Sequence, residues 1–195
     1  MPLRKLLRSI GLILVIFGLV YPFAFGFDDG FGAGRQIQGK YFVIIYSSGL
    51  EAVNLAQQLN IGQAEKILFG GSSKRASGYD EILSDMLDTL FLQVGDILDM
   101  HLYSYQGRIK VCRNQEQLNQ IYNNMFNRDL KGMRSFYIYN LNTIYISGDS
   151  FTREILGHEI AHAIISNYFV VQPPVKVAEV LSGYVEYQLR KPGQK

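Results

Sequence analysis

The sequence predicts an α+β fold, because strand-like segments come first and helical segments come at the end of the chain. Segments 40–48, 108–113 and 135–147 are rich in the β-branched and aromatic residues that strands favour. Segments of about 151–168 and 175–189 follow and are expected to be helices. The length of 195 residues, with 48% hydrophobic and 18% charged residues, favours one domain with a hydrophobic core and excludes a disordered chain.

Residues 1–26 are predicted as a targeting segment. A short basic stretch, residues 1–8, precedes residues 9–26, which contain no charged side chain. Ala24 and Gly26 supply the small residues of a signal-peptide cleavage site, but with its apolar flanks the run also approaches the roughly 20 residues of a membrane span. A cleaved signal peptide and an uncleaved membrane anchor both stay open. Either one predicts an exported protein, periplasmic or anchored in the inner membrane and facing the periplasm.

Charge and cysteine content narrow the class of protein further. The formal net charge is +2, and it falls to −1 when Arg4, Lys5 and Arg8 are removed with the targeting segment. A chain without a basic bias is not expected to bind nucleic acid. Cys112 is the only cysteine, so no intramolecular disulfide can form, and we expect a buried, unreactive thiol.

The first elements of the domain follow a short linker. Residues 27–39 are rich in glycine and polar residues, which predicts a linker between the targeting segment and a domain over residues 40–195. After the strand at 40–48, the apolar spacing of residues 50–60 predicts a short helix. Residues 79–100 predict a longer helix, whose apolar stripe is expected in the core and consists of Ile82, Met86, Leu90, Val94 and Ile97.

The middle of the chain predicts three further elements. After the strand at 108–113, the amphipathic pattern of residues 115–126 predicts a polar helix. Two strands are expected within 135–147, around a turn at residues 140–142. The later of these, residues 143–147, is either an edge strand that pairs with an extended peptide or a plain interior strand.

The last two helices are separated by Pro173 and Pro174, which break the chain. Asp149 or Ser150 is expected to cap the first of them, over about residues 151–168. The second is expected over about residues 175–189, packed on the first.

One segment of the penultimate helix has the pattern of a metal site. Residues 156–164 read LGHEIAHAI, which contains the H-E-x-x-H pattern at His158, Glu159 and His162. Residues i and i+4 share one face of a helix, so both imidazoles can reach one zinc ion. Glu159 lies beside them and can reach a water at the ion without being a ligand, as a general base must.

Chance is a poor explanation of this pattern, because two of the three histidines of the chain fall in it. Histidines that serve only structure on a surface helix are the alternative. The neighbours of the pattern are mostly apolar, however, and burial of two imidazoles and an acid costs free energy unless something compensates for it. A metal ion would do so.

The third ligand cannot be chosen from the residues alone. No histidine follows the pattern, and the last helix offers Glu179 and Glu186, which are seven residues apart and share a face. If the two helices are antiparallel around a turn near residue 171, both carboxylates lie close to the level of the histidines, Glu179 slightly closer. Both candidates therefore stay open.

A resemblance to a known family adds to these patterns. The segments GHEIAHAI and PPVKVAEVLSGYVEY resemble the gluzincin zinc peptidases, in particular small exported relatives of the thermolysin and aminopeptidase superfamily. The resemblance covers about residues 134–190. It implies a zincin-like fold, in which a small antiparallel or mixed sheet accompanies an HExxH helix packed on a C-terminal helix. It also implies Zn²⁺ as cofactor, Glu179 as third ligand, and a peptide or protein as substrate.

The chain also departs from the family pattern. Thermolysin-like members carry an aspartate four residues after the ligand glutamate, where it orients a ligand histidine, and this chain has Gly183 there. Glu154, one turn before His158, is a candidate replacement. Family members stabilise the transition state with a nearby tyrosine or histidine, for which Tyr184 and Tyr187 are the nearest candidates.

These patterns and the resemblance together predict zinc-dependent hydrolysis of peptide bonds in the cell envelope, with Glu159 as general base. The first alternative is a catalytically inactive zinc-binding domain that binds peptides or envelope proteins. The second is a membrane-tethered binding module without a metal.

Overall fold

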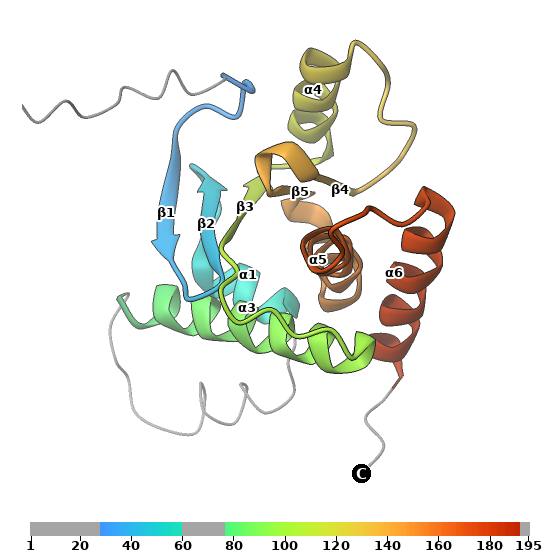
Figure 1. The fold of residues 1–195 in the computed structure, drawn as a ribbon. Helices are drawn as coiled ribbons and strands as arrows, with labels where there is room; N and C mark the ends of the chain where they lie inside the picture. The colour runs from blue at the N-terminus through green and yellow to red at the C-terminus, as the bar shows by residue number, and fades with distance from the viewer. Residues whose placement is uncertain (1–27, 60–76, 192–195) are drawn as a thin grey trace, which may run out of the picture.

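The computed structural model of the protein describes residues 28–59 and 77–191, which form one mixed sheet and five α-helices (Figure 1). The strands are β1 (Gly34–Gln38), β2 (Phe42–Ser47), β3 (Gly107–Cys112), β4 (Ser135–Ile138) and β5 (Thr143–Ser147). The helices are α1 (Ala52–Leu59), α3 (Ser77–Leu98), α4 (Gln115–Phe126), α5 (Arg153–Tyr168) and α6 (Val175–Arg190), with short 3-10 turns η1 (Tyr139–Leu141) and η2 (Gly148–Ser150). The α+β class is confirmed, and the predicted targeting segment, residues 1–26, lies outside the described residues.

The sheet has the strand order β1-β2-β3-β5-β4. The three central strands β2, β3 and β5 are parallel, and each is rich in apolar residues because both of its faces are covered. The outer strands β1 and β4 pair antiparallel with their neighbours. Residues 143–147 are therefore an interior strand, β5, and of the two alternatives the edge strand is wrong. The edge on this side of the sheet is β4.

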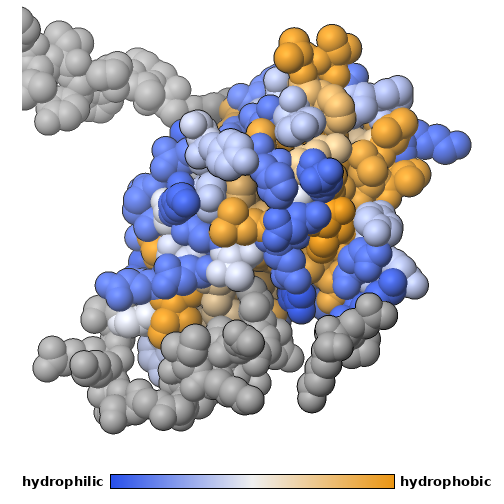
Figure 2. Space-filling view, turned by 60° about the horizontal axis from the view of Figure 1, so that its bottom comes forward, coloured by the Kyte–Doolittle hydropathy of each residue, from blue (hydrophilic) through white to orange (hydrophobic). Residues whose placement is uncertain are grey.

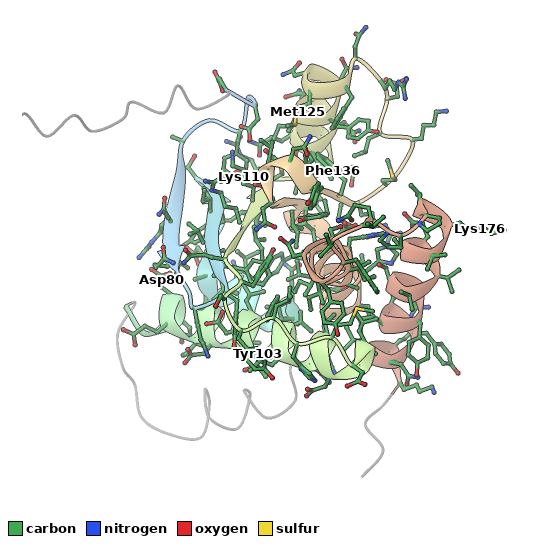
Figure 3. The ribbon with its side chains drawn as sticks, viewed as in Figure 1. Asp80, Tyr103, Lys110, Met125, Phe136 and Lys176 are labelled. Carbon is green, nitrogen blue, oxygen red and sulfur yellow. The ribbon has the colours of Figure 1, made fainter. Side chains whose placement is uncertain are left out.

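Helices cover both faces of the sheet. On one face, Ile44, Ile109 and Ile144 pack against α1, α3 and α5 in the main core. On the other face a smaller core forms under α4, where Figure 3 shows Met125 and Phe136 between the helix and the sheet. Cys112 belongs to this smaller core, and its burial raises its pKa to about 12, which confirms a buried thiol.

The segment predicted as a linker is partly a strand. Gly34–Gln38 forms β1, which the sequence did not predict, because only Ile37 of its five residues is buried. Pairing with β2 supplies the strand instead.

A buried ion pair fixes the residues before β1. The Asp29 carboxylate is 5% exposed and accepts hydrogen bonds from Lys110 Nζ of β3, from Tyr145 Oη of β5 at 2.5 Å and from Phe31 N at 3.0 Å. Burial alone would raise the pKa of Asp29, but these hydrogen bonds outweigh it and the pKa lies below its usual value. The start of the described chain is thus tied to the centre of the sheet.

The helices α5 and α6 pack closely against each other. Helix α5 is capped by the side chain of Thr152, so the prediction that Asp149 or Ser150 caps this helix is wrong. At Gly157, an added Cβ atom would lie 2.1 Å from Leu189 Cδ1, so the end of this buried side chain of α6 would have to move. Glycine at this position therefore allows the close approach of the two helices beside His158.

The outer face of α6 is apolar and exposed. Val177, Val180 and Tyr184 are all more than 40% exposed, and apolar side chains gather on the right of Figure 2, the side on which α6 lies in Figure 1. Within the described part of the chain, none of the helices combines the length and apolar character that a membrane span requires.

Candidate metal centre

Two histidines of α5 bring their ring nitrogens together. His158 and His162 are four residues apart, and their Nε2 atoms lie 3.2 Å from each other. Both side chains are mostly buried, with 23% and 17% exposed. Burial and the neighbouring His158 lower the pKa of His162, against the opposing effect of Glu179, so His162 is held in the neutral form that a metal ligand requires.

Glu179 of α6 completes a triangle with the two nitrogens. Its Oε2 atom lies 3.7 Å from His158 Nε2, and its Oε1 atom lies 3.6 Å from His162 Nε2. Ligand atoms about 2.0–2.1 Å from a tetrahedral zinc lie about 3.3 Å from one another. One atom from each of the three residues lies within 4.8 Å of the others, so a small movement of the side chains would bring them to this spacing. These are the residues that the structure brings together as candidate ligands.

Glu186 is not part of this triangle. Its carboxylate approaches the other nitrogen of His158, with Oε2 3.4 Å from Nδ1. The structure thus separates the two carboxylates that the sequence left open: Glu179 faces the converging nitrogens and Glu186 faces the back of one imidazole. Of the described residues, only three form this candidate group, so a tetrahedral zinc held by them would have one position for another molecule, as catalytic zinc sites do.

Glu186 lies beside the second ring nitrogen of His158. The Nδ1 atom of His158 is buried and has no hydrogen-bond partner of good geometry in the described chain, and Glu186 is the carboxylate beside it. Arg190, one turn later on α6, holds the other carboxylate oxygen of Glu186 at 2.5 Å. The side chain of Glu154, the candidate from the sequence, forms no hydrogen bond or ion pair with the described residues. A small rotation of Glu186 would let it accept from Nδ1 and orient the ring.

Replacing Glu186 by alanine should therefore lower the zinc affinity about 10- to 100-fold, the range typical for loss of a carboxylate behind a ligand histidine. Competition with a chromophoric zinc chelator measures this. Glu154→Ala, which removes a carboxylate from α5 instead, is the matched control and should change the affinity less than about twofold. Equal losses in the two variants would contradict the assignment of Glu186.

Glu159 lies next to the ligands but does not join them. It is 6% exposed, and its Oε1 accepts a 2.7 Å hydrogen bond from Ser135 Oγ of β4. Burial raises its pKa to about 7; the hydrogen bond from Ser135 opposes this rise, and Glu179 adds to it. A carboxylate in this environment is suited to exchange protons near neutral pH.

A cleft of about 740 Å³ runs past the centre. Its lining includes His158, Glu159, His162, Glu179 and Glu186. Residues 132–137, which include the first three residues of β4, form one wall. On the opposite side lie Pro173, Val175 and Ala178, from the start of α6 and the turn before it.

The wall formed by β4 is an edge of the sheet, and among the described residues only β5 pairs with this strand. The Arg134 carbonyl accepts from Ser147 N at 3.0 Å, and the register places Ser135 opposite Ile146. Because hydrogen-bonded pairs alternate in an antiparallel ladder, Ser135 and Tyr137 turn their backbone N–H and C=O groups away from β5, toward the free edge. An extended peptide can pair with such an edge.

The structure does not bring Tyr184 and Tyr187 to the cleft. They are 48% and 57% exposed, neither lines the cleft, and Tyr187 contacts Lys191 instead. The tyrosines that do line it are Tyr137 and Tyr139. Tyr137 Oη donates to Asn142 and accepts from Asn167, and burial raises its pKa to about 12.

The chain matches no family model, and neither a curated protein nor a solved structure matches it. Its function must therefore be inferred from the geometry of the centre and of the cleft around it. Sequence analysis missed one residue of this region, Ser135, because its contact with Glu159 joins positions 24 residues apart in the chain, and nothing in the local pattern signals it.

Proposed function

We propose that the protein is a zinc-dependent peptidase of the cell envelope. The observation that carries this proposal is the convergence of two imidazole nitrogens and one carboxylate at separations of 3.2, 3.6 and 3.7 Å, beside a buried carboxylate that is not a ligand. Two nitrogen donors and one carboxylate with one position left open are typical of catalytic zinc sites. The envelope location comes from the targeting segment that the sequence predicts.

Each part of the centre has a role in this proposal. A zinc ion held by His158, His162 and Glu179 would supply Lewis-acid chemistry, which polarises a peptide carbonyl and makes water more acidic. Glu159 takes a proton from the attacking water and then gives it to the leaving amine, so its carboxylate begins and ends ionised. The free edge of β4 holds the peptide extended along the cleft.

The inactive zinc-binding domain is the second candidate function. The observation in its favour is the position of Tyr184 and Tyr187, because the two expected transition-state stabilisers lie outside the cleft. Binding of zinc and of peptides would then occur without hydrolysis. An assay of cleavage distinguishes the two candidates directly.

Full-length protein loaded with zinc should cleave a mixture of unstructured peptides, should lose this activity with 1,10-phenanthroline and should regain it with added zinc. Glu179→Ala should retain no stoichiometric zinc after gel filtration, since one of three ligands is gone. Mass spectrometry of the peptides and metal analysis of the protein measure both. Stoichiometric zinc without cleavage would favour the inactive domain, and a parent protein without zinc affinity would contradict both candidates.

A further inference from the structure

Ser135 is the first residue of β4 and joins that strand to the proposed general base. Its hydroxyl donates to Glu159 Oε1 at 2.7 Å, and both side chains are buried, at 8% and 6% exposed. Among the described residues, Ser135 is the hydrogen-bond donor to the Glu159 carboxylate. The hydroxyl therefore fixes one oxygen of the carboxylate and leaves the other to exchange a proton.

The backbone of the same residue faces the substrate side. The N–H and C=O groups of Ser135 point away from β5 and toward the free edge of β4, where an extended peptide would pair. One residue thus contacts the peptide through its main chain and the general base through its side chain. Because both contacts are made by Ser135, the distance between the bound peptide and the Glu159 carboxylate stays constant.

We propose that Ser135 is a positioning residue that holds Glu159 in register with the bound peptide. This inference rests on the proposed peptidase function. Without the hydroxyl, the carboxylate can rotate about its side-chain bonds, and misplacement of a reacting group by about 1 Å can cost a hundredfold in rate. Peptide pairing with β4 uses backbone groups and does not depend on the hydroxyl.

A purely structural role for the hydroxyl makes a different prediction. If Ser135 only satisfied a buried acceptor, its loss would lower the stability of the protein and would leave the chemistry of the folded fraction unchanged. Two measurements therefore distinguish the roles. The first is whether loss of the Ser135 hydroxyl changes kcat more than KM, and the second is whether this change requires Glu159.

The test compares Ser135→Ala, Ser135→Thr and Ser135→Val in the full-length zinc protein. Thr and Val have nearly the same shape and differ by the hydroxyl, so this pair decides the question even if Ala does not fold. We expect Ala and Val to lower kcat at least about tenfold with KM within about twofold, and Thr to stay within a few-fold of the parent. Ser84→Ala, at another buried serine, is the matched control and should not change kcat.

Coupling to Glu159 gives a second readout. In a Glu159→Gln background, Ser135→Ala should cause no further loss of kcat, since the group that it positions is already inactive. In metal-free protein, Ser135→Ala should lower the urea midpoint in the parent and not in a Glu159→Ala background, because the partner is absent there.

The outcomes separate this inference from the proposed function. If Glu159→Gln abolishes cleavage while Ser135→Val cleaves as fast as Ser135→Thr, the positioning role is wrong and the peptidase proposal stands. If the parent cleaves no peptide, the peptidase proposal fails, and the urea experiment still reports whether Ser135 and Glu159 are coupled. Equal effects of Ser135→Ala in both urea backgrounds would overturn the contact itself.

Discussion

Replacing Glu159 by glutamine should lower kcat/KM for peptide cleavage about a thousandfold while one zinc stays bound. Glutamine keeps the size of the side chain and can still accept the hydrogen bond from Ser135. It cannot take a proton, however, and general acid–base catalysis contributes about 10²- to 10⁴-fold. The proposed ligands His158, His162 and Glu179 are unchanged, so metal analysis should give the stoichiometry of the parent.

The matched control for this substitution is Glu154→Gln, the same change on the same helix, one turn before His158. It should keep kcat/KM within about twofold of the parent. A Glu159→Gln protein that cleaves peptides at the rate of the parent would refute Glu159 as general base. Loss of zinc from this variant would show instead that the carboxylate is needed for the ligand geometry.

Asp29→Asn should lower the free energy of unfolding by about 3 kcal/mol at neutral pH. The substitution leaves the Lys110 ammonium, whose side chain is 19% exposed, without its anionic partner, and breaking a buried ion pair from one side costs about 3–5 kcal/mol. Partial exposure of Lys110 places the expected value at the lower end of this range. Urea unfolding at pH 7 measures it, with Asp28→Asn, at the exposed neighbouring position, as the control.

The effect of Asp29 should also depend on pH, with a sign that follows from its lowered pKa. An aspartate has a pKa of about 3.9 in the unfolded state, and the pKa of Asp29 is lower in the folded protein. Ionised Asp29 therefore contributes its full stabilisation of the fold above about pH 3.9. This stability is lost as the pH falls through the pKa of the folded state. The difference between parent and Asp29→Asn should therefore shrink below about pH 4. A constant difference from pH 7 to pH 3 would contradict the lowered pKa.

The fold class and most elements were predictable because their signals are local. The expected bounds of β2, β3, α4 and α6 agree with the structure to within two residues, since apolar periodicity and capping residues act over a few positions. Strand β1 was not predictable in this way, because its sequence GRQIQ lacks an alternating apolar pattern. Its strand conformation depends on hydrogen bonds with β2, which is a tertiary interaction.

The same distinction applies to the candidate site. The relation of His158 to His162 follows from one helical turn, whereas Ser135 reaches Glu159 only because β4 lies beside α5. The position of Tyr184 outside the cleft also has a local cause, which lies in the geometry of the helix. At 100° per residue, Tyr184 is about 140° around α6 from Glu179, while Glu186 is only about 20° away. A helix that presents Glu179 to α5 therefore presents Glu186 too and turns Tyr184 to solvent.

Gly157 gives the centre an unusual dependence on residues that carry no ligand atom. The separation of α5 and α6 beside His158 is set where the bare backbone of Gly157 meets Leu189 and Val185. Two of the proposed ligands lie on α5 and the third on α6, so the apolar contacts between the helices would limit how closely the ligand atoms can approach one another. In the proposed zinc centre, a change in volume at these apolar positions should therefore alter the separation of the ligands.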